Sequence, residues 1–204
     1  MTTSDSLLRL TKRFRHFLPI VIDLETSGLN PLTAAILEIA AVTLTVDPNG
    51  KLQPNQTYAY QVEPFIGAHL DPESLELTKI DPTYPLRYAI PERQALHRLF
   101  RRTKALLAQT EYPRAILVGH NAWFDLSFLQ AATKRCHLVA ENPFHSFTSF
   151  DTATLSGIFL GETVLAKAAR CAKIAFDVNQ AHSAIYDAER TAELFCFLVN
   201  KVNK

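Results

Sequence analysis

The chain has 204 residues, 48% of them hydrophobic and 20% charged, and this balance is typical of a folded protein with a sizeable core. No Gly/Ser-rich linker divides it, so we expect a single domain over residues 1–204. The formal net charge of +1 gives no global sign of nucleic-acid binding, although an acidic pocket and basic patches can coexist at that value.

The cysteines and the apolar runs argue against several classes of protein. Cys136, Cys171 and Cys196 are odd in number, lie far apart and form no Cys-x-x-Cys pair, which argues against a disulfide scaffold and a zinc site. No basic segment leads into an apolar one at the N-terminus, and no apolar run approaches about 18 residues. We therefore expect neither a signal peptide nor a membrane span, and we expect the protein in the cytoplasm.

The first part of the chain predicts an antiparallel β-meander. Leucines and basic residues alternate over residues 7–16 and indicate a short amphipathic segment. Apolar residues, many of them β-branched, then predict strands over residues 20–24, 35–44 and 58–62. The Asp-Pro-Asn-Gly sequence at residues 47–50 is a strong turn signal between the last two strands.

Asp23 and Glu25 place two carboxylates at the end of the first predicted strand. Because side chains alternate along a strand, both project to the same face, where they repel each other unless a divalent cation lies between them. The Asp-x-Glu pattern alone is weak evidence for a metal site and is far more typical of a solvated strand end followed by a turn. Glu38 in the second strand is a further candidate ligand, but a carboxylate that is hydrogen-bonded to neighbouring backbone groups fits that position better.

The middle of the chain predicts helices around a parallel strand. Residues 71–72 and 91–92 are typical helix starts, because an acidic cap or a proline stands at the first position. Residues 115–119 predict a short buried strand between two helices, as in a βαβ unit. If Asn121 caps the next helix, Asp125 lies one turn inside it, near the strand end where α/β folds bind ligands. A partner for the helix dipole is the simpler role for such an aspartate.

The last helix carries an aspartate on its apolar side. Residues 147–150 predict a fifth strand, and Asp151 is best explained as the N-cap of the helix that follows, so we leave it out of the site. Asp187 shares a helical face with apolar residues, where an unpaired carboxylate is costly. His182 stands five residues earlier, and at a loop-to-helix junction it can reach the same place, although a capping or core histidine is the commoner role. These elements predict an α/β protein with a five-stranded mixed sheet, an antiparallel meander plus parallel strands, flanked by helices.

Three short motifs carry a resemblance to a known family. Residues 23–26 (Asp-Leu-Glu-Thr), 120–125 (His-Asn-Ala-Trp-Phe-Asp) and 181–190 (with His-x4-Asp) resemble the three exonuclease motifs of the DEDD superfamily, in its histidine branch. Within the superfamily the chain is similar to the ribonuclease T family from about residue 13 to residue 200. This resemblance implies a ribonuclease-H-like fold, a homodimer, and 3′-to-5′ trimming of single-stranded ends of tRNA and other stable RNAs, with DNA also attacked.

The resemblance also implies a two-metal site. It assigns two Mg²⁺ ions, with Mn²⁺ as an alternative, to four carboxylates: Asp23, Glu25, Asp125 and Asp187. His182 would accept the proton of the attacking water.

The family's base-contacting positions are only partly aromatic in this chain. Phe124 and Phe147 match two of the aromatic residues that wedge against terminal bases, whereas Leu29 and Leu77 replace the other two. Glu73 matches a further base-contacting position. Leucine offers an apolar contact without the π-face that makes stacking worth about 1–3 kcal/mol, so we expect a different terminal-base preference.

The family's basic patch is also incomplete. Arg13, Arg15 and Arg114 match its cations, while Ala140 and Glu141 stand where the family carries basic residues. Two alternatives to an exoribonuclease stay open: a DNA proofreading or repair exonuclease with the same chemistry, and a nucleic-acid-binding module without catalysis. The second requires the loss of at least one site residue, and all five are present in the sequence.

Overall fold

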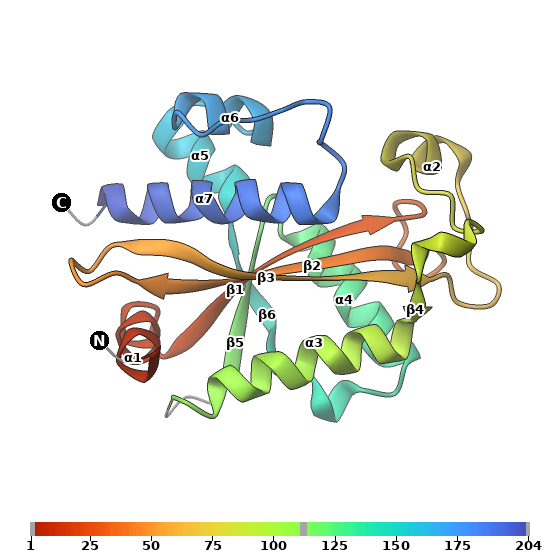
Figure 1. Ribbon diagram of the computed structural model, residues 1–204, viewed down its shortest axis with the longest axis horizontal. Helices are drawn as coiled ribbons and strands as arrows, with labels where there is room; N and C mark the ends of the chain where they lie inside the picture. Colours follow the sequence, from red (N-terminus) through yellow and green to blue (C-terminus); the bar gives the residue numbers. More distant parts are fainter. Residues whose placement is uncertain (1–2, 111–113, 203–204) are drawn as a thin grey trace.

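The computed structural model describes residues 3–110 and 114–202, and its centre is a six-stranded mixed sheet in the order β4-β3-β2-β1-β5-β6 (Figure 1). The strands are β1 (Phe17–Thr26), β2 (Ile36–Val46), β3 (Leu52–Glu63), β4 (Ile90–Pro91), β5 (Arg114–Gly119) and β6 (Phe144–Asp151). The helices are α1 (Thr3–Arg13), α2 (Pro72–Thr78), α3 (Glu92–Leu107), α4 (Trp123–Arg135), α5 (Thr152–Leu160), α6 (Leu165–Cys171) and α7 (Ala184–Val202). Two 3₁₀ turns, η1 (Pro85–Arg87) and η2 (Val139–Glu141), complete the described elements.

The sheet combines the two predicted kinds of pairing. β1 pairs with β2 and β2 with β3 in antiparallel fashion, which confirms the meander, and β5 and β6 are added in parallel beside β1. The predicted count of five strands was one too low, because the two-residue β4 is too short to leave a pattern. Its Pro91 also serves as the N-cap position of α3, the role that the sequence predicted.

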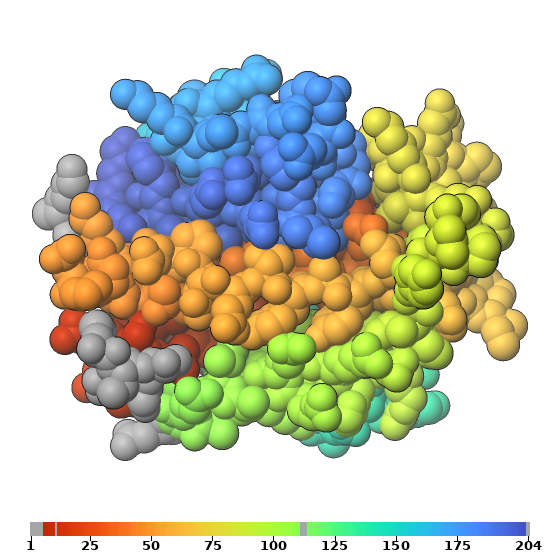
Figure 2. All heavy atoms as spheres, viewed as in Figure 1, coloured from red at the N-terminus to blue at the C-terminus, as the bar shows by residue number. Residues whose placement is uncertain are grey.

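Helices cover both faces of the sheet. α5, α6 and α7 lie on one face, with α7 across β1, β2 and β3, and α1, α3 and α4 lie on the other (Figure 1 and Figure 2). β1 and β2 are buried on both faces because their residues are apolar throughout, apart from the acidic residues and threonines near the strand ends. In the described part of the chain, no helix is long and apolar enough to cross a membrane.

The helix starts were predicted correctly except at α4. Asp71 caps α2 by accepting the Ser74 N–H, and Asp151 caps α5. The α4 cap position is Ala122, without a side-chain hydrogen bond, so the prediction for Asn121 was wrong. Asn121 has a left-handed backbone with a φ of 61°, and its N–H donates to Asp151 Oδ1 at 2.7 Å. The acceptor at this turn therefore comes from the end of β6 and not from the local sequence.

Glu92 and Arg135 tie α3 to α4 through a buried ion pair. Glu92 is 6% exposed, and Arg135 Nε and Nη2 donate to its two oxygens at 2.9 and 2.7 Å. The same guanidinium lies 3.9 Å from the centre of the Phe65 ring, on the segment that leads into α2. Arg135 therefore connects α4 with α3 and with the segment before α2.

We expect Arg135→Ala to lower the free energy of unfolding by about 3 kcal/mol, because it leaves the buried Glu92 charge without a partner. Urea unfolding followed by circular dichroism measures this. The matched control is Arg101→Ala, an exposed arginine of α3, which should change stability by less than about 0.5 kcal/mol. Equal effects of the two substitutions would contradict a stabilising role for the pair.

Candidate active site

Asp23 and Glu25 lie on one face of β1, as the alternation of strand side chains predicted. In the sheet register, Asp23 pairs with Ala40 and Glu25 with Glu38 on β2. Glu25 is only 8% exposed. The strand therefore ends in two carboxylates that leave the same side of the sheet beside a third acidic residue.

Asp125 reaches the same place from the first turn of α4. It is 4% exposed, and its Oδ1 accepts the backbone N–H of Leu24 at 3.1 Å, between the two β1 carboxylates in sequence. Gly119, at the end of β5, permits this approach, because a Cβ atom there would lie 3.1 Å from Asp125 Oδ2 and 3.1 Å from Ala122 Cα. The predicted location near the strand end is therefore correct, although Asn121 is not the cap.

Asp187 and His182 come from the start of α7. Asp187 Oδ2 accepts the backbone N–H of His182 at 2.9 Å, and His182 has a left-handed φ of 65°. One ligand atom each of Glu25, His182 and Asp187 lies within 4.8 Å of the others. The turn before α7 therefore brings the exposed His182 side chain to the carboxylates, as the sequence predicted.

The carboxylates are held where ionisation is unfavourable. Burial raises the pKa of Asp23 well above its ordinary value, and the neighbouring acidic charges, first that of Asp125, raise it further. Burial is also the main cause that raises the pKa of Glu25 and of Asp125, each to about 8, and it raises the pKa of Asp187. Among the described residues, no ion pair to lysine or arginine neutralises these four groups.

The donor set fits a divalent cation. Asp187 Oδ1 is buried and has no hydrogen-bond partner, so one oxygen of the cluster lacks the interaction that a buried acceptor needs. Carboxylate oxygens are the ligands that Mg²⁺ and Mn²⁺ prefer, and a positive ion would stabilise the ionised carboxylates, which burial and, at Asp23 and Glu25, the neighbouring acidic charges disfavour. Asp23, Glu25, Asp125 and Asp187 are the residues that could hold it.

The predicted base-contacting residues are exposed at the surface, apart from the half-buried Phe124 in α4. Phe124 precedes Asp125 in α4 and is half-buried against Trp123 and Phe128, with ring centres 5.9 and 4.8 Å away. Phe147 is 88% exposed and Leu29 is 81% exposed, and the side chains of Leu77 and Glu73 are exposed as well. Apolar side chains that the core leaves exposed are available for contact with a ligand.

The three predicted basic residues gather at the opposite end of β1. Arg114 is exposed and pairs with Phe17 at the start of that strand, two residues after the exposed Arg15. Arg13 is half-buried, and its Nη2 donates to Val199 O at 2.9 Å. One of its hydrogen-bond donors is therefore used to bind α7. Asp23 lies six positions after Phe17 in the strand, and this corresponds to a distance of about 20 Å at about 3.3 Å per residue.

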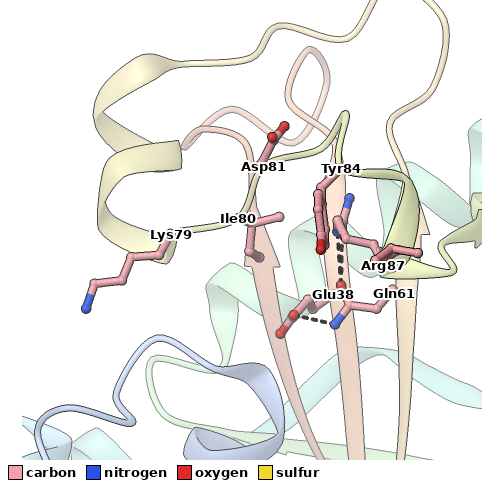
Figure 3. A pocket seen from close by; sticks show the side chains of 8 residues that line it. Glu38, Gln61, Lys79, Ile80, Asp81, Tyr84 and Arg87 are labelled. Carbon is pink, nitrogen blue, oxygen red and sulfur yellow. Dashed lines mark hydrogen bonds between the residues drawn. The ribbon is translucent and has the colours of Figure 1, made fainter.

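Glu38 is hydrogen-bonded to a backbone N–H, which is the role that the sequence favoured, but the sequence did not indicate its partners. Its Oε2 accepts the backbone N–H of Ala184 at 3.2 Å, and its Oε1 accepts Gln61 Nε2 at 2.5 Å. A pocket of about 480 Å³ opens beside it, lined in part by Gln61 and Arg87 (Figure 3). Sequence analysis missed both of these residues, because no local pattern marks a side chain whose partners lie on other elements.

Comparison with known proteins agrees with this arrangement. Residues 20–195 match the RNase_T family, which is described as an exonuclease. The chain is 54% identical to a ribonuclease T of Pectobacterium atrosepticum over 98% of this chain and 90% of that protein. Many further curated proteins match it, among them a ribonuclease T of Vibrio vulnificus at 52% identity over 98% of this chain and 93% of that protein.

Two solved structures show the same fold at low identity. The nuclease domain of 3′hExo, a DEDDh family member bound to rAMP, superposes with a TM-score of 0.65 at 18% identity, over 91% of this chain and 90% of that one. E. coli exonuclease I in complex with a dT13 oligonucleotide gives a TM-score of 0.69 at 15% identity, over 92% of this chain but only 42% of that one. By its sequence match over most of its length, the chain belongs to the ribonuclease T family of exonucleases.

Proposed function

We propose that this 3′-to-5′ exonuclease acts on RNA as a metal-dependent enzyme that trims the single-stranded 3′ ends of tRNA and other stable RNAs. The observation that carries the proposal is the convergence of four carboxylates from β1, α4 and α7, with His182 beside them. We propose further that it works as one exonuclease domain over residues 1–204. The three free cysteines fit the reducing cytoplasm, where we place it.

Two Mg²⁺ ions are the cofactor that we assign to Asp23, Glu25, Asp125 and Asp187, with Mn²⁺ as an alternative. Bound divalent ions supply a nucleophile at neutral pH and neutralise charge on the reacting phosphate. Each helical aspartate accepts a backbone N–H, and Asp187 Oδ1 has no hydrogen-bond partner, so this oxygen is available to a cation. This arrangement supports a role as metal ligands for both aspartates.

His182 is the residue that we assign to proton transfer. Its side chain is exposed beside Glu25 and Asp187, and its backbone N–H is fixed by the Asp187 carboxylate. A neutral imidazole at this place can accept the proton of the water that attacks the terminal phosphodiester. Phe124, next to Asp125, offers an aromatic ring to an unpaired base, together with the exposed Phe147.

The distance between the basic group and the cleft supports a homodimer. Arg15 and Arg114 lie near the start of β1, about 20 Å from Asp23 along the strand. At that distance they do not contact the phosphates next to the cleft of their own subunit. Because the cleft is acidic, the phosphates upstream of the scissile bond need cations that lie outside the cleft. We propose that this basic group serves the cleft of a second subunit.

A 3′-tailed RNA hairpin tests the function. We expect the tail to shorten from its 3′ end only when Mg²⁺ or Mn²⁺ is present, with slow cleavage at the helix because base contacts need unpaired nucleotides. The control Asp23→Asn should abolish turnover, and Mg²⁺ should raise its melting temperature less than that of the wild type. Full activity in chelator would refute the metal assignment. Faster cleavage of a matched DNA hairpin would favour a DNA repair role.

We expect His182→Ala to lower turnover by about 10²–10⁴-fold while metal affinity stays unchanged, because the side chain moves a proton and does not ligate metal. Calorimetric titration with Mn²⁺ and single-turnover cleavage measure the two quantities. If the substitution also removes metal binding, His182 is a ligand and its assigned role is wrong.

Mixed dimers test the role of the basic group in trans. We expect Asp23→Asn and the double variant Arg15→Ala/Arg114→Ala each to be nearly inactive on RNA. After subunit exchange, activity should return to about a quarter of the wild-type value, because about half of the dimers are mixed and each has one intact cleft facing one intact basic group. Arg13 is left unchanged because it also binds Val199 O. No recovery after demonstrated exchange would refute the arrangement.

A further inference from the structure

A row of polar residues continues the active site across the sheet. In the register of β1, β2 and β3, Glu25 pairs with Glu38 and Glu38 pairs with Gln61, so the three side chains stand on the same face. Glu38 is half-buried and belongs to neither helix that supplies an active-site aspartate. Because like charges on paired strand positions repel, a second glutamate opposite Glu25 needs a reason of its own.

The far end of this row is fixed by an arginine of η1. Gln61 Nε2 donates to Glu38 Oε1, and Gln61 Oε1 in turn accepts from Arg87 Nε and Nη2 at 3.2 and 3.0 Å (Figure 3). Arg87 Nη2 also donates to Leu37 O at 2.8 Å, on the backbone next to Glu38. The carboxylate of Glu38 is therefore oriented by a chain of hydrogen bonds that ends on its own strand.

The other oxygen of Glu38 holds the start of α7. Glu38 Oε2 accepts the N–H of Ala184, the first residue of that helix, at 3.2 Å. The first N–H groups of a helix have no partner within it, and a carboxylate there also interacts favourably with the helix dipole. Glu38 thus caps α7 from a neighbouring strand, 146 residues away in sequence.

Ala184 stands between the two site residues of this segment. His182 lies two residues before it and Asp187 three residues after it, and the two are joined by the hydrogen bond from the His182 N–H to Asp187 Oδ2. A shift of the first turn of α7 would therefore move both at once. Both oxygens of Glu38 already accept a hydrogen bond, one from Gln61 and one from Ala184.

We propose that Glu38 is a positioning residue for the cleavage reaction: held by Gln61 and Arg87, it fixes the first turn of α7 and with it the places of His182 and Asp187. This inference rests on the proposed function, since it names what aligns the residues of that site. It assigns Glu38 neither a contact with metal nor one with substrate.

Two substitutions of Glu38 separate positioning from metal binding. Glu38→Ala removes the acceptor for the Ala184 N–H, and we expect it to lower kcat by about 100-fold, as a misplacement of about 1 Å can do, with KM and metal affinity unchanged. Glu38→Gln loses the charge and the bond from Gln61 but keeps an oxygen for Ala184, so it should lower kcat by no more than about 5-fold. The matched control is Glu63→Ala, an exposed glutamate at the end of β3, which should behave as wild type.

Amide hydrogen exchange reads the same contact without any catalysis. The Ala184 N–H should exchange faster in Glu38→Ala than in the wild type, and at about the wild-type rate in Glu38→Gln. If Glu38→Ala does not fold, Glu38→Leu replaces it, because it keeps a side chain of similar volume without an acceptor for the Ala184 N–H, and it should show both the faster exchange and the lower kcat.

Three results would overturn the inference. The first is an unchanged Ala184 exchange rate in Glu38→Ala, and the second is a wild-type kcat in that variant. The third is a Glu38→Gln variant that is as impaired as Glu38→Ala with reduced metal affinity, since Glu38 would then be a ligand. A wild-type protein that cleaves no RNA would instead refute the proposed function, and the exchange measurement would still decide whether Glu38 holds α7.

Discussion

The cost of holding four carboxylates together in a buried place at the end of β1 is the constraint on which the rest of the structure depends. Asp23 and Glu25 leave a strand that is buried on both faces, and Asp125 and Asp187 meet them from two helices. Their raised pKa values mean that the ionised groups oppose folding when no cation is present. The sheet and its two helical layers must therefore hold the site together, and a bound cation would remove part of the penalty.

Backbone N–H groups from other elements hold the two helical aspartates in place. Leu24 on β1 donates to Asp125 Oδ1, and His182 donates to Asp187 Oδ2. The unpartnered Oδ1 of Asp187 is the consequence of this arrangement. Asp151 acts similarly on the turn before α4, because it accepts the N–H of Asn121. Local hydrogen bonds therefore set the geometry, while Asp187 Oδ1 stays available for a ligand.

Sequence patterns predicted what depends on neighbours in the chain and failed where the partner is distant. Alternation along β1 placed Asp23 and Glu25 on one face, and the cap of α2 followed from its own residues. The cap expected at Asn121 was wrong because its role is filled from β6. Arg87 left no signal either, since its acceptors lie on β2 and β3. The sequence placed the four carboxylates by strand alternation, by the strand end before α4 and by the apolar face of α7, and the motif resemblance then assigned them to two metal ions.

The length of β1 separates the acidic groups, which could bind metal, from the basic groups, which could bind phosphate. The acidic groups lie at its end and Arg15 and Arg114 near its start, about 20 Å apart. A net charge of +1 hides this polarity, because it sums 21 basic and 20 acidic residues without regard to their positions. An RNA strand whose terminal phosphate lies among the carboxylates has its upstream phosphates outside that acidic field, where cations can bind them. The rigid strand that builds the site therefore keeps the acidic and the basic groups apart at a fixed distance.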